Sequence, residues 1–367
     1  MTEQTLTDAV PAGAPAPGDV LLEASGLTKH FPVMDGFLIK RQIGAVQAVD
    51  GVDFQIHQGE ALGLVGESGC GKSTTGRLVS RLLEPTAGRL SYRGVDITHA
   101  NRKQLAPIRS EIQMIFQDPY ASLNPRHTVG TIVAGPMEIN NINPPGGREA
   151  RVKELLEIVG LNPEHYNRFP HEFSGGQRQR IGVARALGLS PKLIVADEPV
   201  SALDVSIQAQ VVNLLQKLQR EMGIAFLFIA HDLAIVRHFS QRVAVMYLGK
   251  IMEVGDREAI YSRPRHPYTH ALLSAAPEAR TTGNDKERIR LAGDVPSPIS
   301  PPSGCRFRTR CWKAQEKCAT EEPPLIQLSG NNAGHLTACH FPEDPDVNVP
   351  KEIVLDPALA ALEDAGE

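Results

Sequence analysis

Three short runs of apolar residues stand out in the hydrophobic pattern of this chain. They are Ala61–Val65, Leu193–Ala196 and Ile224–Ala230. Continuous apolar runs of this length are typical of parallel strands that are buried on both faces. Polar residues whose side chains could take part in binding or catalysis follow each run closely. The pattern therefore predicts strands of a buried sheet with functional side chains near their ends.

Helical periodicity separates these runs. A strand–loop–helix unit is predicted after the first run, because apolar residues recur there at helical spacing: Leu78, Val79, Leu82 and Leu83. A mostly helical stretch is predicted over about residues 100–190, with Pro and Gly breaks at residues 144–147. One helix face in it carries Ile181, Ala184 and Leu187. The alternation predicts an α/β core with a helical insertion.

Composition sets the class of protein. The 367 residues allow one large domain and a smaller one, and 41% hydrophobic with 22% charged residues is ordinary globular composition. A net charge of −4 argues against a surface built to wrap nucleic acid. No apolar run approaches the roughly 18 to 20 residues that span a bilayer, and no secretory signal is visible. We expect a soluble intracellular protein whose membrane role, if any, comes through a partner.

Changes in composition predict the domain boundaries. Residues 1–19, rich in Ala, Pro, Thr and Gly, are predicted to be a disordered leader. The main domain is predicted over residues 20–260, and a proline-rich segment then opens a second unit over residues 261–342. The tail, residues 343–367, is acidic at first and ends in a weakly predicted helix.

A phosphate-binding loop follows the first apolar run, because residues 66–73 fit the pattern G-x-x-x-x-G-K-S in full. Its glycines let backbone N–H groups surround phosphates, and the next helix directs its N-terminus at them. Lys72 would neutralise the β- and γ-phosphates, and the Ser73 hydroxyl would coordinate Mg²⁺. A simple glycine-rich turn explains the match less well. The residues expected at the nucleotide are Gly66, Glu67, Ser68, Gly69, Cys70, Gly71, Lys72, Ser73 and Thr74.

Two acidic residues end the second apolar run. Asp197 is placed to hold Mg²⁺, directly or through water, and Glu198 to polarise the attacking water. An ordinary acidic strand end is the alternative. It loses weight because a phosphate-binding loop and an apolar strand precede the pair.

Ser174, Gly175, Gly176 and Gln177 precede a predicted helix, an arrangement that suits an anion or a simple helix cap. With Phe173 they match the signature motif of the ATP-binding cassette (ABC) family, which this sequence resembles. In that family the motif completes the ATP site of the opposite subunit. The resemblance therefore implies a dimer that closes around ATP.

The resemblance assigns further residues one by one. Gln117 matches the Q-loop glutamine, which senses Mg²⁺ and contacts the transmembrane partner, and residues 201–204 match the D-loop at the dimer interface, which includes Asp204. His231 matches the switch histidine that contacts the γ-phosphate. The implied catalytic residues are Glu198, His231 and Gln117. The implied Mg²⁺ site consists of Ser73, Gln117 and Asp197.

An aromatic residue near the start of the domain should stack on adenine. Phe31 is the best match. An insertion over about residues 33–45 follows it, so Phe37 remains an alternative.

Other segments resemble one branch of the family, the dipeptide and oligopeptide importer ATPases. Residues 116–126 and 263–269 resemble this branch, and the first of these segments includes the proposed contact with a permease. Residues 69–71 and 83–86 resemble its second (F-type) ATPase subunit. The implied fold is a P-loop NTPase domain of ABC type, with a mixed-sheet core, a helical subdomain and a small cysteine-containing extension.

The branch also implies partners and a location. A sister ATPase, two transmembrane permease subunits and an extracytoplasmic solute-binding protein are expected, with the chain peripheral at the cytoplasmic face of the plasma membrane. Relatives in this branch move peptides, nickel, glutathione or sugars, so the solute stays open, as does pairing with itself. A soluble ATPase clamp in DNA repair or translation is the alternative function, but the long coiled coil or second cassette of such proteins is missing from this sequence.

Four of the five cysteines gather near the end of the chain: Cys305, Cys311, Cys318 and Cys339. Their spacing lacks the close pairs of zinc ribbons, and four thiolates suit zinc or an iron–sulfur cluster. The resemblance favours a [4Fe–4S] cluster, with Zn²⁺ or no metal as alternatives. Basic residues among them would offset a cluster's charge or form a solvated face: Arg306, Arg308, Arg310 and Lys313.

Overall fold

The computed structural model describes residues 19–36, 41–275, 289–328 and 334–343. The predicted leader apart from Asp19, the predicted tail apart from Glu343, and Phe37 lie outside these residues. No helix in the described ranges is long and apolar enough to cross a membrane.

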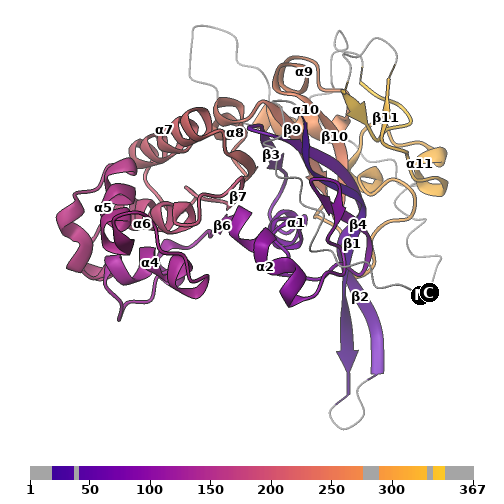
Figure 1. The fold of residues 1–367 in the computed structure, drawn as a ribbon. Helices are drawn as coiled ribbons and strands as arrows, with labels where there is room; N and C mark the ends of the chain where they lie inside the picture. Colours follow the sequence, from indigo (N-terminus) through magenta and orange to yellow (C-terminus); the bar gives the residue numbers. More distant parts are fainter. Residues whose placement is uncertain (1–18, 37–40, 276–288, 329–333, 344–367) are drawn as a thin grey trace, which may run out of the picture.

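A mixed sheet forms the centre of the molecule (Figure 1). Its strand order is β11-β12-β10-β9-β3-β8-β7-β6. The strands from β6 to β9 in this order pair in parallel, whereas β10, β12 and β11 pair antiparallel. The bounds are β3 Ala61–Val65, β6 Ile112–Ile115, β7 Leu193–Asp197, β8 Ala225–Ile229, β9 Arg242–Tyr247, β10 Lys250–Asp256, β11 Ile326–Gln327 and β12 Leu336–Thr337. The three predicted strands are thus confirmed, and so is the mixed-sheet core that the family resemblance implied.

Both faces of the central strands are covered, which explains their continuous apolar sequence. Every residue of β3, β7 and β8 is buried. Alternate residues enter different cores, as in β8, where Phe226 and Phe228 face one core and Leu227 the other. This is the period of two that a strand imposes on its side chains.

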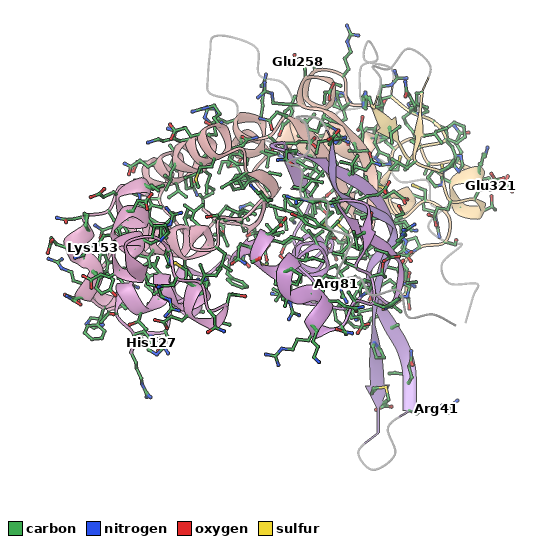
Figure 2. All side chains as sticks on the ribbon, in the orientation of Figure 1. Arg41, Arg81, His127, Lys153, Glu258 and Glu321 are labelled. Atoms are coloured by element: carbon green, nitrogen blue, oxygen red, sulfur yellow. The ribbon has the colours of Figure 1, made fainter. Side chains whose placement is uncertain are left out.

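A second, antiparallel sheet covers one of these faces. Its order is β2-β1-β4-β5, with β1 Val20–Asp35, β2 Arg41–His57, β4 Ala87–Tyr92 and β5 Val95–Asp96. The ends of β1 and β2 extend beyond the body of the molecule as a long two-stranded arm, with Arg41 at its far end (Figures 1 and 2).

Helices fill the remaining layers. The helical lobe, defined here as α3 to α6, stands beside the sheet on the side of β6 and β7 (Figure 1). The α-helices are α1 Lys72–Val79, α2 Arg102–Glu111, α3 Pro119–Ser122, α4 Val129–Ile139, α5 Gly147–Ile158, α6 Gly175–Leu187, α7 Val205–Met222, α8 Leu233–Phe239, α9 Arg257–Ser262, α10 Pro267–Ala275 and α11 Glu316–Thr320. Short 3₁₀ turns cover Pro163–Asn167, Pro170–Glu172 and Arg308–Arg310.

One prediction needs correction. The helix after the phosphate-binding loop ends at Val79, so Leu82 and Leu83 lie beyond it. Arg81 adopts a left-handed backbone with φ 52°, which stops the helix, and Leu82 is 54% exposed. The stretch of residues 100–190 is mostly helical and also contains β6, which pairs with β7.

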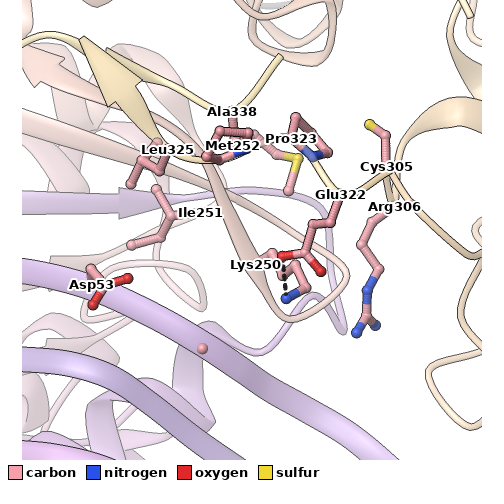
Figure 3. Close-up of a pocket in the computed structure, with 13 residues that line it drawn as sticks. Asp53, Lys250, Ile251, Met252, Cys305, Arg306, Glu322, Pro323, Leu325 and Ala338 are labelled. Atoms are coloured by element: carbon pink, nitrogen blue, oxygen red, sulfur yellow. Dashed lines mark ion pairs between the residues drawn. The ribbon is translucent and has the colours of Figure 1, made fainter. Parts of the chain in front are cut away.

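The C-terminal extension, defined here as the described residues from 263 to 343, packs against the body of the main domain. Its strand β12 pairs with β10 of the central sheet. A pocket of about 230 Å³ lies at this junction, and Lys250 and Glu322 form an ion pair across it (Figure 3). The extension therefore continues the fold of the main domain and is not a tethered appendage.

The core packing predicts the cost of one truncation. Phe228 is fully buried and lies 4.4 Å from the ring of Phe239, centroid to centroid. Phe228→Ala should lower the free energy of unfolding by about 3–5 kcal/mol, because it leaves a cavity. Thermal unfolding followed by circular dichroism would show a lower midpoint. Ile139→Ala is the control, since Ile139 is 83% exposed, and an equal loss in both variants would contradict the packing described here.

Candidate functional site

Four parallel strands end at one edge of the central sheet. In the order β3, β8, β7 and β6, each is hydrogen-bonded to the next in parallel. The phosphate-binding loop follows β3, His231 follows β8, Asp197 ends β7 and Gln117 follows β6. Residues far apart in the chain thus meet at the carboxyl ends of the strands, where open α/β sheets bind ligands.

The phosphate-binding loop fits closely against its surroundings, which explains two of its glycines. Gly66 has φ 155° and Gly71 has φ 109°. A Cβ on Gly66 would lie 2.0 Å from the carbonyl oxygen of Met246, and one on Gly71 would lie 2.0 Å from that of Ala48. Only glycine can occupy these positions.

Lys72 is the first residue of α1 and is only 4% exposed. Its Nζ donates to the carbonyl oxygens of Gly66, at 2.8 Å, and Glu67, at 2.9 Å. The ammonium group therefore lies inside the curve of its own loop, directed back over the residues predicted to hold phosphate.

Two oxygen ligands suited to Mg²⁺ lie next to each other. The Ser73 hydroxyl donates to Oδ1 of Asp197 at 2.8 Å. Asp197 is 3% exposed, and burial raises the pKa of its carboxyl group, although the hydrogen bond from Ser73 opposes the shift. A buried carboxylate beside a hydroxyl favours a bound cation, since a cation offsets the cost of burying the charge.

Glu198 stands at the centre of a second group. Its Oε2 accepts from Nε2 of Gln117 at 2.8 Å and lies 3.5 Å from Nδ1 of His231. Its backbone is left-handed, with φ 44°, and its N–H donates to the carbonyl of Ile229 at 2.9 Å. A non-glycine residue pays for this conformation with strain, and such strain is concentrated at functional sites.

Six predicted site residues are therefore brought together by contacts or by chain neighbours. They are Lys72, Ser73, Gln117, Asp197, Glu198 and His231. Their individual roles stay predictions.

The Ser174–Gln177 motif lies on the helical lobe, where it forms the N-terminus of α6. Ser174 and Gln177 form a capping box: the Ser174 hydroxyl accepts from the N–H of Gln177, and the Gln177 side chain accepts from the N–H of Ser174. A Cβ on Gly176 would lie 2.4 Å from Cγ2 of Ile207, so this glycine allows α6 and α7 to approach closely. Asp204 occupies the N-cap position of α7, and the following Val205 is 82% exposed.

Phe31 lies in β1 and is partly exposed, and the Nζ of Lys29 stands 5.3 Å from its ring centroid. Its contact with adenine stays a prediction.

Two residues of the C-terminal extension contact the phosphate-binding loop, and the sequence predicted this contact for neither of them. The Tyr268 hydroxyl accepts from the backbone N–H of Glu67 at 2.9 Å, and Arg310 forms a bidentate ion pair with the Glu67 carboxylate. Tyr268 belongs to the segment of residues 263–269, which resembles one branch of the family, but that resemblance predicts no contact with the loop.

The four C-terminal cysteines all line one small cavity. Burial raises the pKa of Cys305 to about 11 and that of Cys339 to about 12, and the proximity of the other thiols adds to both shifts. Without a cation these two thiols are protonated at neutral pH. In the part of the chain that is described, no group of three or more His, Cys, Asp or Glu side chains is arranged so that it could hold a metal ion.

The neighbouring arginines do not form a solvated basic face. Arg306, Arg308 and Arg310 are each 6–7% exposed. Arg306 pairs with Asp50 and Arg310 with Glu67, both of the main domain, whereas Arg308 and Lys313 line the cysteine cavity. Two of the four basic residues thus bind the extension to the main domain.

Comparisons with known families match two parts of the chain. The profile described as "ABC transporter" matches residues 49–201. The profile described as "Oligopeptide/dipeptide transporter, C-terminal region" matches residues 252–318.

Similar proteins extend the match over most of the chain. The oligopeptide transport ATP-binding protein AppF of Bacillus subtilis is 52% identical over 88% of this chain and 98% of its own length. The dipeptide transport ATP-binding protein DppF of Haemophilus influenzae is 52% identical over 87% of this chain and 96% of its own.

Among solved structures, the ATP-binding cassette MJ0796, a dimer in a post-hydrolysis state bound to ADP and Pi, superimposes with a TM-score of 0.57. It is 28% identical, and the match covers 65% of this chain and 99% of that one. CbiO1 of Clostridium perfringens, part of the ABC transporter complex cbiONQ, gives 0.57 at 26% identity, with 67% and 92% covered.

The geometry around Glu198 predicts a variant that separates binding from hydrolysis. Glu198→Gln keeps the size of the side chain but removes the carboxylate that would polarise water. We expect ATP to bind and hydrolysis to fall by about 100-fold or more, as loss of a general base does. Phosphate release and equilibrium ATP binding would measure the two steps. Glu221→Gln, at an exposed position of α7, is the control, and normal turnover by Glu198→Gln would remove Glu198 from this role.

Proposed function

This chain belongs to the ATP-binding proteins of ABC transporters, within the oligopeptide and dipeptide group, and on that premise we propose that it hydrolyses ATP to drive the import of short peptides. The observation that carries the proposal is the group of polar side chains at the ends of β3, β6, β7 and β8. Ser73 and Asp197 lie at one side of this group and Glu198 with Gln117 at the other.

The site residues would divide the work of phosphoryl transfer. Lys72 would exchange its loop carbonyls for the β- and γ-phosphates of ATP. Ser73, Asp197 and Gln117 would hold Mg²⁺, which neutralises charge on the phosphates. Glu198, kept in place by Gln117 and by its strained backbone, would orient and polarise the attacking water. His231 would contact the γ-phosphate from the end of β8.

A second subunit would complete the site. The Ser174–Gln177 motif lies on the helical lobe, against α7. We propose that it binds the ATP held by a partner ATPase, with Asp204 at the interface, and that the partner is a sister subunit. Contacts with the γ-phosphate would close the dimer, and hydrolysis would release it.

The surface beside Gln117 suits a membrane-embedded partner. Tyr120 is 59% exposed and Phe116 39% exposed, and Arg178 lies 4.1 Å from the Tyr120 ring centroid. We propose that residues 118–126 receive a segment of a permease subunit at the cytoplasmic face of the plasma membrane, with an extracytoplasmic binding protein supplying the solute. Peptides are favoured over nickel, glutathione or sugars because AppF and DppF are named for oligopeptide and dipeptide transport.

Copurification tests the assembly. The tagged Glu198→Gln variant, purified with ATP from membranes in mild detergent, should bring down two polytopic permeases and a second ATPase, identified by mass spectrometry. Tyr120→Ala should lose the permeases, because it truncates an exposed residue of the proposed contact surface. Recovery of only ribosomal or DNA-associated proteins would favour a soluble clamp instead.

We also propose that Cys305, Cys311, Cys318 and Cys339 bind a [4Fe–4S] cluster. Their convergence on one cavity supports this proposal. A cluster binds each thiolate through a different iron, so its ligands need not be arranged around a single point, as those of Zn²⁺ must. Arg308 and Lys313 at the cavity would offset its negative charge.

Metal analysis tests the cluster. Protein purified without oxygen should be brown and contain about four irons per chain. Cys311→Ser should lower the iron content, whereas Cys70→Ser should not, because Cys70 lies in the phosphate-binding loop. Colourless protein that contains zinc and no iron would contradict the proposal.

A further inference from the structure

The phosphate-binding loop is contacted from outside the main domain at its second residue, Glu67. Two nitrogens of Arg310 donate to the two carboxylate oxygens of Glu67, at 2.7 and 3.2 Å. The Tyr268 hydroxyl accepts from the Glu67 N–H at 2.9 Å. The Glu67 carbonyl in turn accepts from Lys72. Side chain, N–H and carbonyl of this one residue are therefore all engaged, two of them by the C-terminal extension.

Three buried aromatic rings support these contacts. Tyr247, Tyr268 and Phe307 are each 0% exposed, and their ring centroids lie 4.7 to 5.3 Å from one another. Phe307 also lines the cysteine cavity, and Arg310 immediately precedes Cys311. Close-packed interiors transmit strain. Movement of the segment from Cys305 to Cys311 would therefore also strain the phosphate-binding loop.

We propose that Arg310 is a positioning residue for ATP binding, which holds Glu67 so that the phosphate-binding loop stays open and Lys72 stays inside it. The C-terminal extension, through Arg310 and Tyr268, then sets the affinity of the main domain for nucleotide. This inference rests on the proposed phosphate site at residues 66–74.

The chemistry of the pair suits such a role. A bidentate guanidinium–carboxylate contact fixes both the position and the plane of the carboxylate, which a lysine cannot do. Burial alone would lower the pKa of Arg310, but the hydrogen bonds to Glu67 and Tyr247 raise it above the ordinary value, so the charge persists. Without the pair, Glu67 would be free to rotate. The loop would then have to be ordered by the nucleotide itself, at the expense of affinity.

A double-mutant cycle on the full-length chain tests whether Arg310 acts through Glu67. The variants are Arg310→Gln, Glu67→Gln and both together, and the readout is the Kd for Mg²⁺–ADP by calorimetry. We expect each single change to raise Kd by about 10-fold, equivalent to about 1.4 kcal/mol, and the double variant to be no weaker than either. Arg310→Lys should recover part of the affinity, because it keeps the charge but loses the planar contact.

Arg306→Gln is the matched control. Arg306 (labelled in Figure 3) lies on the same segment and is as buried as Arg310, but it pairs with Asp50 on β2. Arg306→Gln should lower the midpoint of thermal unfolding and leave the Kd for ADP unchanged.

The possible results separate the two proposals. Additive effects in the double variant, or a lower thermal midpoint for Arg310→Gln with unchanged Kd, would show a merely structural role and overturn the inference. Lys72→Ala addresses the premise: if it bound ADP as well as the parent chain did, the phosphate site itself would be misplaced. If Lys72→Ala lost ADP binding and the effects of the Arg310 and Glu67 variants were additive, the role of Arg310 would be rejected and the phosphate site would stand.

Discussion

Parallel pairing of strands buried on both faces is the constraint on which the rest of this structure depends. In β3, β7 and β8 every residue is buried, and all of them are apolar except Asp197, the last residue of β7. Polar residues therefore appear only where the strands end. Because the strands run in the same direction, these ends share one edge of the sheet. Hydrophobic burial thus decides where the chemistry can be.

Close backbone packing then shapes the site. Gly66 and Gly71 lie against carbonyl oxygens of neighbouring strands, where any Cβ would clash. Glu198 adopts a left-handed backbone that is unfavourable for a side chain of its kind, and the hydrogen bond to Ile229 keeps it there. The glycines avoid strain at these close approaches, whereas Glu198 is strained, and the well-packed sheet orders both parts of the site before any ligand binds.

The C-terminal extension adds a second layer of control to this edge. It extends the central sheet through β12, fills the space behind the phosphate-binding loop with aromatic rings, and contacts Glu67 directly. A cysteine cavity and a nucleotide loop are thereby placed on two sides of one aromatic cluster. A change in structure at the cysteines can therefore be transmitted through these rings to the nucleotide loop, and the reverse also holds.

The sequence by itself determined the buried strands, the phosphate-binding loop and the identity of the polar residues that follow, because local periodicity and short motifs carry that information. It also indicated the family through Phe173–Gln177 and the segments of one branch. Helix ends were less certain: Leu82 continues the helical spacing, but the backbone of Arg81 turns away before it.

Only the tertiary structure decided which of these residues meet. Gln117 and Glu198 are far apart in the chain, and so are Glu67 and Arg310; neither pair has a local pattern that predicts its contact. The arginines among the cysteines show the difference best. A run of basic residues is usually solvated, and nothing in its spacing reveals that Arg306 and Arg310 are buried against carboxylates of another domain. Long-range pairing is set by packing, and the local patterns of one sequence do not reveal which distant side chains will pair.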